Sequence, residues 1–340
     1  MGYQVSFCIP EHNECELVLE LVQSLLSNPD PNFQVVVSDN MTDNADPSEV
    51  YRDIHDERFR LYQTETALSR QENYLRALEY GEGEYLYMVL GRDWLDSGKI
   101  GGLLSLLRTA RENRIDLLMD RKAVESFRPY YGIEAINQFI NSEHPTGLII
   151  SRASLLACQR RREYFIPGNT YPETFIKRDI LAEGGAAAKI SSGVYANLPT
   201  RTSLGRRVSG SDPFTDQTKM KNVYFSQGQV LKAYQDEIEM VLDDPRFHLT
   251  EAERTGFFQQ KYRSLLQRSI IENKLSVQSE EYMMHYGMRR FYLPVDDMLK
   301  NLTAAALAGI KTEYRFAPRW KLGLLKDAYA VARNVINGVY

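Results

Sequence analysis

Residues Tyr3 to Asn40 read YQVSFCIPEHNECELVLELVQSLLSNPDPNFQVVVSDN. Apolar residues dominate Tyr3 to Ile9 and again Phe33 to Ser38, and apolar runs of this length are typical of buried strands. Between them, Glu14 to Asn28 carries apolar residues at spacings of three and four, which predicts an amphipathic helix. We expect Pro10 to end the first strand. A strand, a helix and a second strand in this order predict a parallel pair in an α/β sheet.

The alternation of strands and helices continues after this stretch. Further strands are predicted over Phe59–Gln63, Glu84–Leu90, Ile115–Met119 and Thr146–Arg152, with another inside Ala186–Pro199. Helices are predicted over Leu68–Tyr80, Lys99–Arg111 and Glu173–Glu183. Gly81 and Gly83 follow the first of these helices, where glycine commonly ends a helix. The alternation therefore predicts an α/β fold with parallel strands.

The chain changes in character near residue 200. Thr200 to Thr218 is rich in Ser, Gly, Thr and Asp, which predicts a loop or linker. Beyond it, helical spacing of apolar residues predicts helices over Val230–Leu242, Glu251–Glu272 and Val295–Ile310. We therefore expect an α/β domain over residues 1–205 and a helical region over 206–340.

Composition excludes several classes of protein. The chain has 340 residues, 41 Lys and Arg against 45 Asp and Glu, and a formal net charge of -4, which disfavours nucleic acid as its main partner. It has 3 cysteines and no CxxC pair, as expected in a reducing compartment. It also lacks an apolar run of about 18 residues, and polar residues interrupt its first segment. These features predict a cytoplasmic location.

The loop after the first strand excludes two common phosphate-binding motifs. The segment IPEHNE, Ile9 to Glu14, contains no glycine, whereas a dinucleotide-binding loop needs glycines where the pyrophosphate approaches the backbone. Gly98 and Lys99 are adjacent, but the other residues of a P-loop are absent. Because a nucleotidyltransferase would also need a glycine- and lysine-rich loop after this strand, that activity is disfavoured too.

Asp39 follows the second strand in VVVSDNMTDN, Val35 to Asn44. Ligands of open α/β sheets bind at the carboxyl ends of the strands, and a carboxylate there can accept a hydrogen bond from a base N–H. Asp and Asn also form turns for purely local reasons. From the residue alone, Asp39 is either a ligand-binding acid or a turn residue.

Together these segments resemble the inverting glycosyltransferases of family 2, which have the GT-A fold. The resemblance begins at Val5 and runs through IPEHN and VVVSDNMTDN to LSRQENYLRALEYGEGEYLYMVLGRDWL, Leu68 to Leu95, and so covers about the first hundred residues. It implies a GT-A (Rossmann-like) nucleotide-sugar-binding domain with a mixed, mostly parallel sheet, followed by a C-terminal helical region. The implied function is transfer of a sugar, with inversion, from a nucleotide-sugar, in the first place a UDP-sugar, to a glycan or polysaccharide acceptor.

The resemblance also implies roles for individual residues. Asp39 would bind the uracil of the donor, and Arg70 would lie near the same donor. The segment YPETFIKRDI, Tyr171 to Ile180, resembles the stretch that holds the family's acidic base, which makes Glu173 the candidate base. The predicted nucleotide-binding residues are Pro10, Glu11, Asn13, Asp39, Arg70 and Gly91.

One departure from the family concerns the metal. The family has an acidic DxD cluster after its fourth strand that holds a divalent cation, whereas this chain reads LGRDWL there, with Leu90 and Arg92 at the two acidic positions. Only Asp93 remains, and a single carboxylate makes a weak site for Mg²⁺ or Mn²⁺ unless the diphosphate and water supply the other ligands. Asp93 is the predicted metal residue, and metal dependence is left open.

Arg92 suggests a replacement for the metal. Departure of a nucleoside diphosphate develops negative charge, and a guanidinium can bind two phosphate oxygens at once. We therefore predict that Arg92 stabilises the leaving group. The alternatives are a surface arginine paired with Asp93 or Asp96, or a site that has lost catalysis. In the last case the protein is an inactive nucleotide-sugar-binding or scaffold protein.

Inversion requires a base for the acceptor hydroxyl, and Glu173, Asp93 and Arg92 are the predicted catalytic residues. Glu173 is either the base or a first-turn glutamate that stabilises its helix. Asp93 and His144 are the reserve candidates, although His144 reads as an exposed loop residue.

Two C-terminal segments carry positive charge. Arg206 and Arg207 lie in the linker and can form a lid over the diphosphate or a solvated loop. Pro318 to Tyr340 combines basic and apolar residues, which suits either a helix docked on this chain or on a second copy, or contact with the inner face of a membrane.

Overall fold

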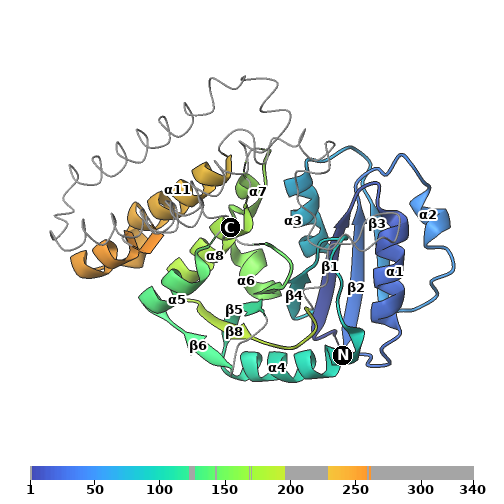
Figure 1. The fold of residues 1–340 in the computed structure, drawn as a ribbon, viewed down its shortest axis with the longest axis horizontal. Coiled ribbons are helices and arrows are strands. Elements are labelled where there is room, and N and C mark those ends of the chain that lie inside the picture. Colours follow the sequence, from blue (N-terminus) through green and yellow to red (C-terminus); the bar gives the residue numbers. More distant parts are fainter. Residues whose placement is uncertain are drawn as a thin grey trace, which may run out of the picture. The chain divides into compact units, whose positions relative to one another are not determined.

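The computed structural model describes residues 2–121, 127–141, 144–167, 169, 171–195, 229–258 and 260–261 (Figure 1). Contacts divide the chain into two compact units, Met1–Ser211 and Asp212–Tyr340. The boundary predicted at residue 205 lies outside the described residues and stays a prediction.

The first unit is built on one sheet of eight strands in the order β3-β2-β1-β4-β7-β5-β8-β6. The strands are β1 (Val5–Glu11), β2 (Phe33–Asp39), β3 (Phe59–Gln63), β4 (Tyr85–Met88), β5 (Ile115–Asp120), β6 (Arg128–Tyr130), β7 (Leu148–Ser151) and β8 (Ala186–Ile190). Strands β3, β2, β1 and β4 are mutually parallel, and β5 is parallel to β8. The antiparallel pairs involve β7 and β6. The predicted mixed, mostly parallel sheet is confirmed.

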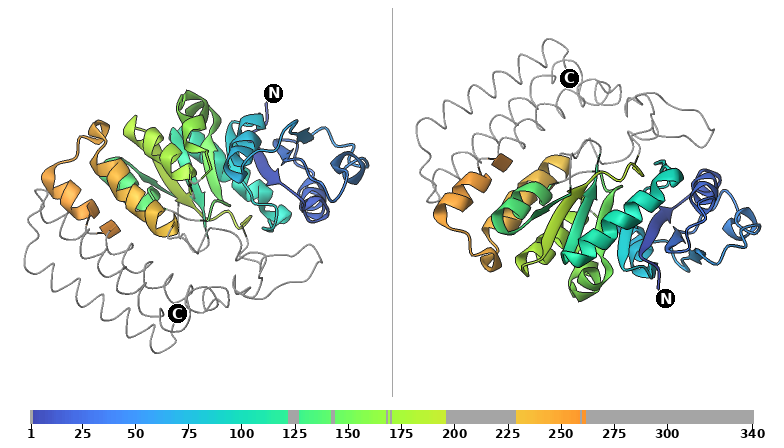
Figure 2. Two further views of the ribbon diagram at one scale, coloured as in Figure 1. Left: turned by 90° about the horizontal axis from the view of Figure 1, so that it is seen from above. Right: turned by 90° about the horizontal axis from the view of Figure 1, so that it is seen from below.

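Helices cover both faces of this sheet (Figures 1 and 2). They are α1 (Cys15–Leu26), α2 (Pro47–Val50), α3 (Arg70–Tyr80), η1 (Ser97–Lys99), α4 (Ile100–Glu112), α5 (Gly132–Phe139), α6 (Arg152–Ala157), α7 (Arg161–Tyr164) and α8 (Glu173–Ala182). On one face, Phe7 and Ile9 of β1 share a core with Leu21 of α1 and Leu104 of α4. On the other face, α3 lies against β1 and β2. Residues of odd number in β1 therefore face α1, and those of even number face away from it.

The end of the first strand was predicted wrongly. β1 continues through Pro10 to Glu11, and Pro10 is in register with Ser38 of β2. The carbonyl of Cys8 accepts from Val89 on the β4 side, so the backbone of Pro10, two residues on, faces the same side. Since β4 ends at Met88, no strand lies beside Pro10 on that side. The missing N–H of proline therefore costs no hydrogen bond between strands, and β1 can continue through Pro10.

The other predicted strands and long helices of the first unit are confirmed to within a few residues at their ends. The short elements α2, α5, α6, α7 and β6 were not predicted. All of them have three to eight residues, too few for a periodic pattern to form.

The second unit is helical where it is described. α11 (Gln229–Leu242) confirms the helix predicted over Val230–Leu242 and is followed by η2 (Pro245–Phe247). The chain is helical again at 251–258 and 260–261, and a reciprocal pair of hydrogen bonds between Thr250 and Glu253 caps this segment. A buried ion pair of 3.2 Å joins Glu237 to Lys261. The predicted linker with Arg206 and Arg207, the helix over Val295–Ile310 and the tail Pro318–Tyr340 lie outside the described residues.

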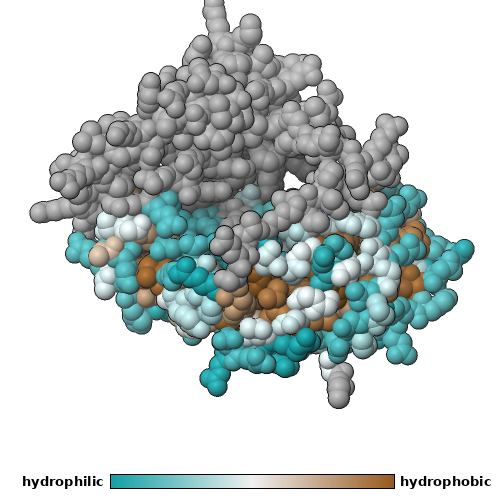
Figure 3. Space-filling model, turned by 60° about the horizontal axis from the view of Figure 1, so that its bottom comes forward, coloured by the Kyte–Doolittle hydropathy of each residue, from teal (hydrophilic) through white to brown (hydrophobic). Residues whose placement is uncertain are grey.

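Exposed apolar side chains are scattered. The large ones among the described residues are Met41, Tyr131, Leu156 and Ile166, which come from four different segments. Figure 3 shows one face, on which hydrophilic residues line the lower edge and apolar and intermediate residues are interspersed above them. Scattered apolar residues are ordinary on a protein surface. Within the part of the chain that the structure describes, no helix has the length and apolar character needed to cross a bilayer.

We expect Gly83→Ala to destabilise the first unit. A Cβ at Gly83 would lie 2.6 Å from the backbone nitrogen of Ser6 and 2.6 Å from the carbonyl carbon of Val5, so β1 would have to shift. Overpacking of this kind costs about 1–3 kcal/mol in the free energy of unfolding. Gly101→Ala is the matched control, because a Cβ there meets nothing within 4 Å and alanine favours the helix. Urea unfolding measures both, and equal stability of the two variants would contradict the prediction.

Candidate active site

The candidate site lies where the chain reverses direction across the sheet. β1 lies between β2 and β4, and the connection after β1 leads to β2, whereas the connection after β4 leads toward β5 on the other side. The loops after β1 and β4 therefore diverge, and ligands of open α/β sheets bind in the crevice at such a switch point. The carboxyl ends of β2, β1 and β4 carry Asp39, Glu11 and the segment around Arg92.

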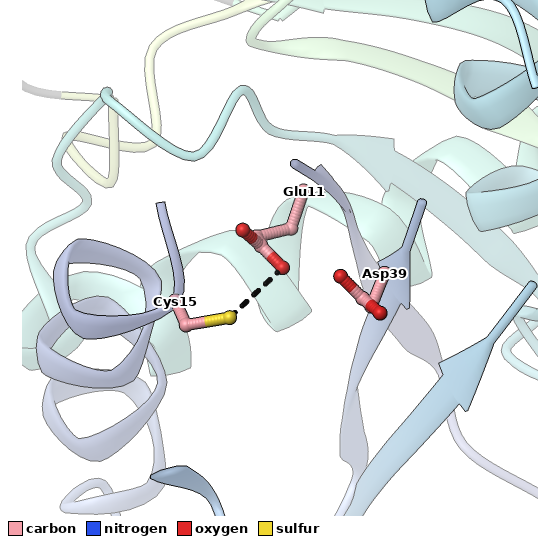
Figure 4. A group of neighbouring side chains, drawn as sticks. All are labelled: Glu11, Cys15 and Asp39. Atoms are coloured by element: carbon pink, nitrogen blue, oxygen red, sulfur yellow. Dashed lines mark hydrogen bonds between the residues drawn. The ribbon is translucent and has the colours of Figure 1, made fainter. Parts of the chain in front are cut away.

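A buried cluster of three side chains lies at this edge (Figure 4). Glu11, Cys15 and Asp39 are 3%, 2% and 1% exposed, and their Sγ and nearest oxygen atoms lie within 4.8 Å of one another. The parallel register pairs Glu11 directly with Asp39, so both carboxyl groups lie on the face that α1 covers. The Cys15 thiol at the start of α1 donates to Glu11 Oε2 at 3.2 Å.

Burial changes the acidity of this cluster. Burial foremost, together with the neighbouring Asp39, raises the pKa of Glu11 from 4.5 to about 7, although the hydrogen bonds from the Glu14 backbone and Cys15 oppose the rise. Two carboxyl groups in contact and out of water share a proton rather than both ionise. Glu11 therefore holds a proton at neutral pH more readily than an ordinary glutamate. Burial also raises the pKa of the Cys15 thiol, which makes it a poor nucleophile.

The loops after β1 and β2 are tied together at the same point. Thr42 donates its backbone N–H to Asp39 Oδ1 at 3.2 Å and its hydroxyl to Glu11. The same hydroxyl accepts the backbone N–H of Asn13 at 2.9 Å, and Asn13 has a left-handed backbone with φ of 59°. Asp39 thus makes the local turn contact that its sequence allowed, at the sheet edge where ligands of open α/β folds bind.

Two buried asparagines hold the strand ends, and sequence reasoning missed both. Asn73 of α3 donates to the carbonyls of Glu11 and Ser38, each at 3.1 Å, and accepts from the Ser38 hydroxyl at 2.8 Å. Asn40 donates its backbone N–H to the Glu11 carbonyl and joins the segment at Leu68 through two hydrogen bonds of its side chain. An asparagine inside a helix is unfavourable for the helix itself, and that was the available signal for Asn73.

The loop after β4 contacts the start of α1. Arg92 forms an ion pair with Glu14 through both Nε and Nη2, so the alternative in which it pairs with Asp93 or Asp96 does not hold. Its predicted role at the leaving group stays a prediction. Gly91 permits this approach, because a Cβ there would lie 2.7 Å from Cγ2 of Val18. Glu14 was not singled out in the sequence, since its partner is far along the chain.

Asp93 points to a different set of residues. Its carboxylate accepts from the Thr146 hydroxyl, which also accepts the backbone N–H of Leu90 at 2.9 Å. Nε2 of His144 lies 3.6 Å from Asp93 Oδ2. Burial raises the pKa of Asp93, whereas His144, Thr146 and Arg121 lower it. The side chain of His144 is half exposed, as expected for a loop residue, but its contact with Asp93 was not foreseen.

The remaining predicted residues lie around this centre. Arg70 begins α3 and donates to the Tyr74 hydroxyl at 2.7 Å. Burial foremost lowers the pKa of His144, Asp93 opposes this, and Arg121 and Arg70 add to the lowering. Glu173 begins α8 and is 2% exposed. The structure thus brings together Glu11, Asp39 and Asn13, and separately Asp93 and His144, while the role of Glu173 stays a prediction.

The described residues do not reproduce an acidic metal site after β4. Asp93 is the one carboxylate that the segment Leu90–Leu95 contributes, and the Thr146 hydroxyl already donates to one of its oxygens. The one group of three metal-ligating side chains found among the described residues is Glu11, Cys15 and Asp39, where the thiol proton points to a carboxylate. The segment after β4, where the family holds its divalent cation, therefore offers a single carboxylate and no acidic pair.

Comparison with known proteins decides the family. The sequence model described as "Glycosyl transferase family 2" matches residues 6–184, which is more than half of the chain. The chain belongs to glycosyl transferase family 2. It is a glycosyltransferase that takes its sugar from a nucleotide-sugar, as the resemblance predicted. A search of curated proteins found no match.

Solved structures show the same fold for this glycosyltransferase. S. aureus TarS 1–349 matches with 15% identity and a TM-score of 0.52 over 93% of this chain and 94% of TarS. TarS 1–349 in complex with UDP-GlcNAc matches with 16% identity and a TM-score of 0.55 over 99% and 92%. The mannosyltransferase PcManGT from Pyrobaculum calidifontis, in complex with GDP-Man and Mn²⁺, matches with 14% identity and a TM-score of 0.50 over 99% and 88%. The predicted GT-A fold is confirmed.

The pKa of Glu11 predicts how the stability of the glycosyltransferase depends on pH. With a pKa of about 7 when folded and 4.5 as its ordinary value, Glu11 makes the folded state bind more protons between these values. The free energy of unfolding therefore falls as the pH rises through this range. Glu11→Gln keeps an oxygen that can accept from the Glu14 N–H, but its amide does not ionise. The variant therefore lacks this decrease in the free energy of unfolding. Thermal unfolding measures the difference in Tm between the variant and the wild type. We expect this difference to be at least about 2 °C more favourable to the variant at about pH 8 than at about pH 5.

The control for this measurement is Glu16→Gln. Glu16 lies in the first turn of α1 and is exposed, so Glu16→Gln makes the same chemical change outside the buried cluster. The difference in Tm between Glu16→Gln and the wild type should stay constant across the pH range. Parallel pH profiles for Glu11→Gln and the wild type would show that Glu11 is ionised normally.

Proposed function

We propose that the protein transfers a sugar from a UDP-sugar to a hydroxyl of a glycan or polysaccharide acceptor with inversion at the anomeric carbon. The observation that carries the proposal is the alignment of Asp39, Glu11 and Arg92 at the ends of β2, β1 and β4. Strands lie about 4.8 Å apart, so β2 and β4 are separated by about 10 Å. This separation suits a nucleoside diphosphate with its base at Asp39 and its phosphates at Arg92.

Asp39 supplies recognition of the base. An ionised carboxylate accepts a hydrogen bond from the N3–H of uracil, and Asp39 stands at the carboxyl end of β2, in register with Glu11. Similar folds do not select the nucleotide, because the TarS structure contains UDP-GlcNAc and the mannosyltransferase structure contains GDP-Man. The choice of UDP therefore rests on Asp39 and on the resemblance of VVVSDNMTDN to the family.

Positive charge stabilises the leaving diphosphate. Arg92 follows β4 and Arg70 begins α3, both at the carboxyl edge of the parallel strands. A fixed guanidinium lowers the free energy of the developing charge without reorganisation of water. We propose that this charge replaces the acidic pair and its cation, since Arg92 occupies an acidic position of the family. Asp93 would then orient His144 and the loop.

Transfer also needs a base on the acceptor side. The acceptor hydroxyl attacks the anomeric carbon opposite the leaving diphosphate and gives its proton to a carboxylate within hydrogen-bond reach. Glu173 is our candidate, because it stands in the segment that resembles the family's base and lies at a helix N-terminus where a carboxylate is favoured. Pro10, Asn13 and Gly91 shape the donor side through the backbone of the loops that carry them.

Asp39→Asn tests donor recognition. The amide keeps an oxygen for the Thr42 N–H but turns an N–H toward the base, so we expect UDP affinity to fall by roughly 10- to 100-fold, the loss of about 1.5–3 kcal/mol from a charged hydrogen bond. Calorimetric titration with UDP and GDP measures the loss. Asp43→Asn, an exposed neighbour in the same loop, is the control and should bind as the wild type does. UDP affinity unchanged in Asp39→Asn would remove Asp39 from the site.

Chelation tests the replacement of the metal. If Arg92 supplies the charge, donor turnover in EDTA should stay within about twofold of turnover with Mn²⁺, because no step depends on the cation. The measurement is release of UDP from a panel of UDP-sugars, with Arg92→Gln alongside. Turnover that vanishes in EDTA and returns with Mn²⁺ or Mg²⁺ would show that the metal is retained.

A further inference from the structure

An ion pair joins the two loops that diverge at the switch point. Glu14 lies between β1 and α1, Arg92 lies after β4, and both Nε and Nη2 of Arg92 contact Glu14 Oε1. Gly91 also lies close to Val18, so the loop after β4 approaches α1 beside the pair. The contact thus spans the crevice in which ligands of open α/β sheets bind.

The pair is placed where a ligand can compete for it. The side chains of Arg92 and Glu14 are 43% and 20% exposed, so solvent reaches the guanidinium. Among the described residues, Glu14 is the one acid in ion-pair contact with Arg92. A partly exposed pair is worth about 1 kcal/mol or less, which the two phosphates of a donor can outweigh.

Release of Arg92 requires little rearrangement at Glu14. The backbone N–H of Glu14 donates to Glu11 Oε1 at 2.6 Å, and this bond does not involve the Glu14 side chain. Glu14 is the residue that precedes the first turn of α1, where the helix dipole favours negative charge. The released carboxylate therefore keeps a favourable position, and the base-binding cluster around Glu11 keeps its geometry.

We propose that Glu14 competes with the donor for Arg92: its carboxylate occupies Arg92 until the diphosphate of a nucleotide displaces it. The inference rests on the proposed binding of the diphosphate by Arg92. A ligand with phosphates binds Arg92 only after the ion pair between Arg92 and Glu14 has broken. A nucleoside without phosphates leaves this ion pair intact. Glu14 thus lowers affinity for every phosphorylated ligand and leaves recognition of the base unchanged.

Glu14→Gln in the full chain tests this role by calorimetric titration at low salt with UDP, inorganic pyrophosphate and uridine. We expect UDP and pyrophosphate to bind about fivefold more tightly to the variant, the factor that corresponds to a pair of about 1 kcal/mol. The gain should shrink at high salt, because exposed charges are screened. Affinity for uridine should not change. Glu16→Gln, which removes an exposed charge from the same turn, should alter none of these affinities.

The outcomes separate this inference from the proposed function. If Arg92→Gln weakens UDP binding while Glu14→Gln leaves it unchanged or weaker, Glu14 does not compete with phosphate and the inference is wrong. If Arg92→Gln leaves UDP binding unchanged, the proposed role of Arg92 is wrong, and the inference with it. A change in uridine affinity in Glu14→Gln would signal a disturbed fold. Glu14→Asp then decides, since it keeps the charge, retracts it from Arg92 and should give a smaller gain for UDP and pyrophosphate and none for uridine.

Discussion

The parallel register of β1 against β2 is the constraint on which the candidate site depends. Because Glu11 is paired with Asp39 and side chains alternate along a strand, the two acids continue the apolar row that ends with Ile9 and Val37 on the α1 face. A shift of one residue in either strand would move one acid to the opposite face. Asn73 opposes such a shift, since it bonds to the carbonyls of Glu11 and Ser38 at once. The geometry of the site is therefore set by backbone pairing and by one buried side chain of α3.

This arrangement is costly for a folded protein and useful for a binding site. Burial of two adjacent carboxyl groups raises the free energy of the ionised state, and the raised pKa of Glu11 is the measure of that cost. Hydrogen bonds from Glu14, Cys15 and Thr42 recover part of it. A cluster that served the fold alone would be more stable with apolar residues at these positions. Its persistence at the edge where ligands bind is physical support for a role in recognition.

Much of the fold could be predicted because its strands and long helices carry strong periodic patterns. The apolar runs of β1, β2 and β4 and the apolar stripe of α1 are local signals, and the order of these elements supports a parallel sheet. The end of β1 was placed wrongly, because whether Pro10 lacks a partner depends on where β4 ends, some eighty residues later. Asp39 could be placed at a strand end from its neighbours alone. Glu14, Thr146 and Asn73 could not be found, since each acts through a residue distant in sequence.

The exchange of an acidic residue for Arg92 changes the charge balance of the site in a way that the structure accommodates. An acid after β4 needs a cation to bind a diphosphate, whereas an arginine there can bind it directly and repels a cation. An arginine without a counterion would leave a positive charge at the mouth of the crevice, open to any anion. Glu14 neutralises that charge from the opposite loop, while Asp93 turns away toward Thr146 and His144. Two charges that are neighbours in sequence thus serve separate partners, and the guanidinium is kept neutralised but within reach of solvent.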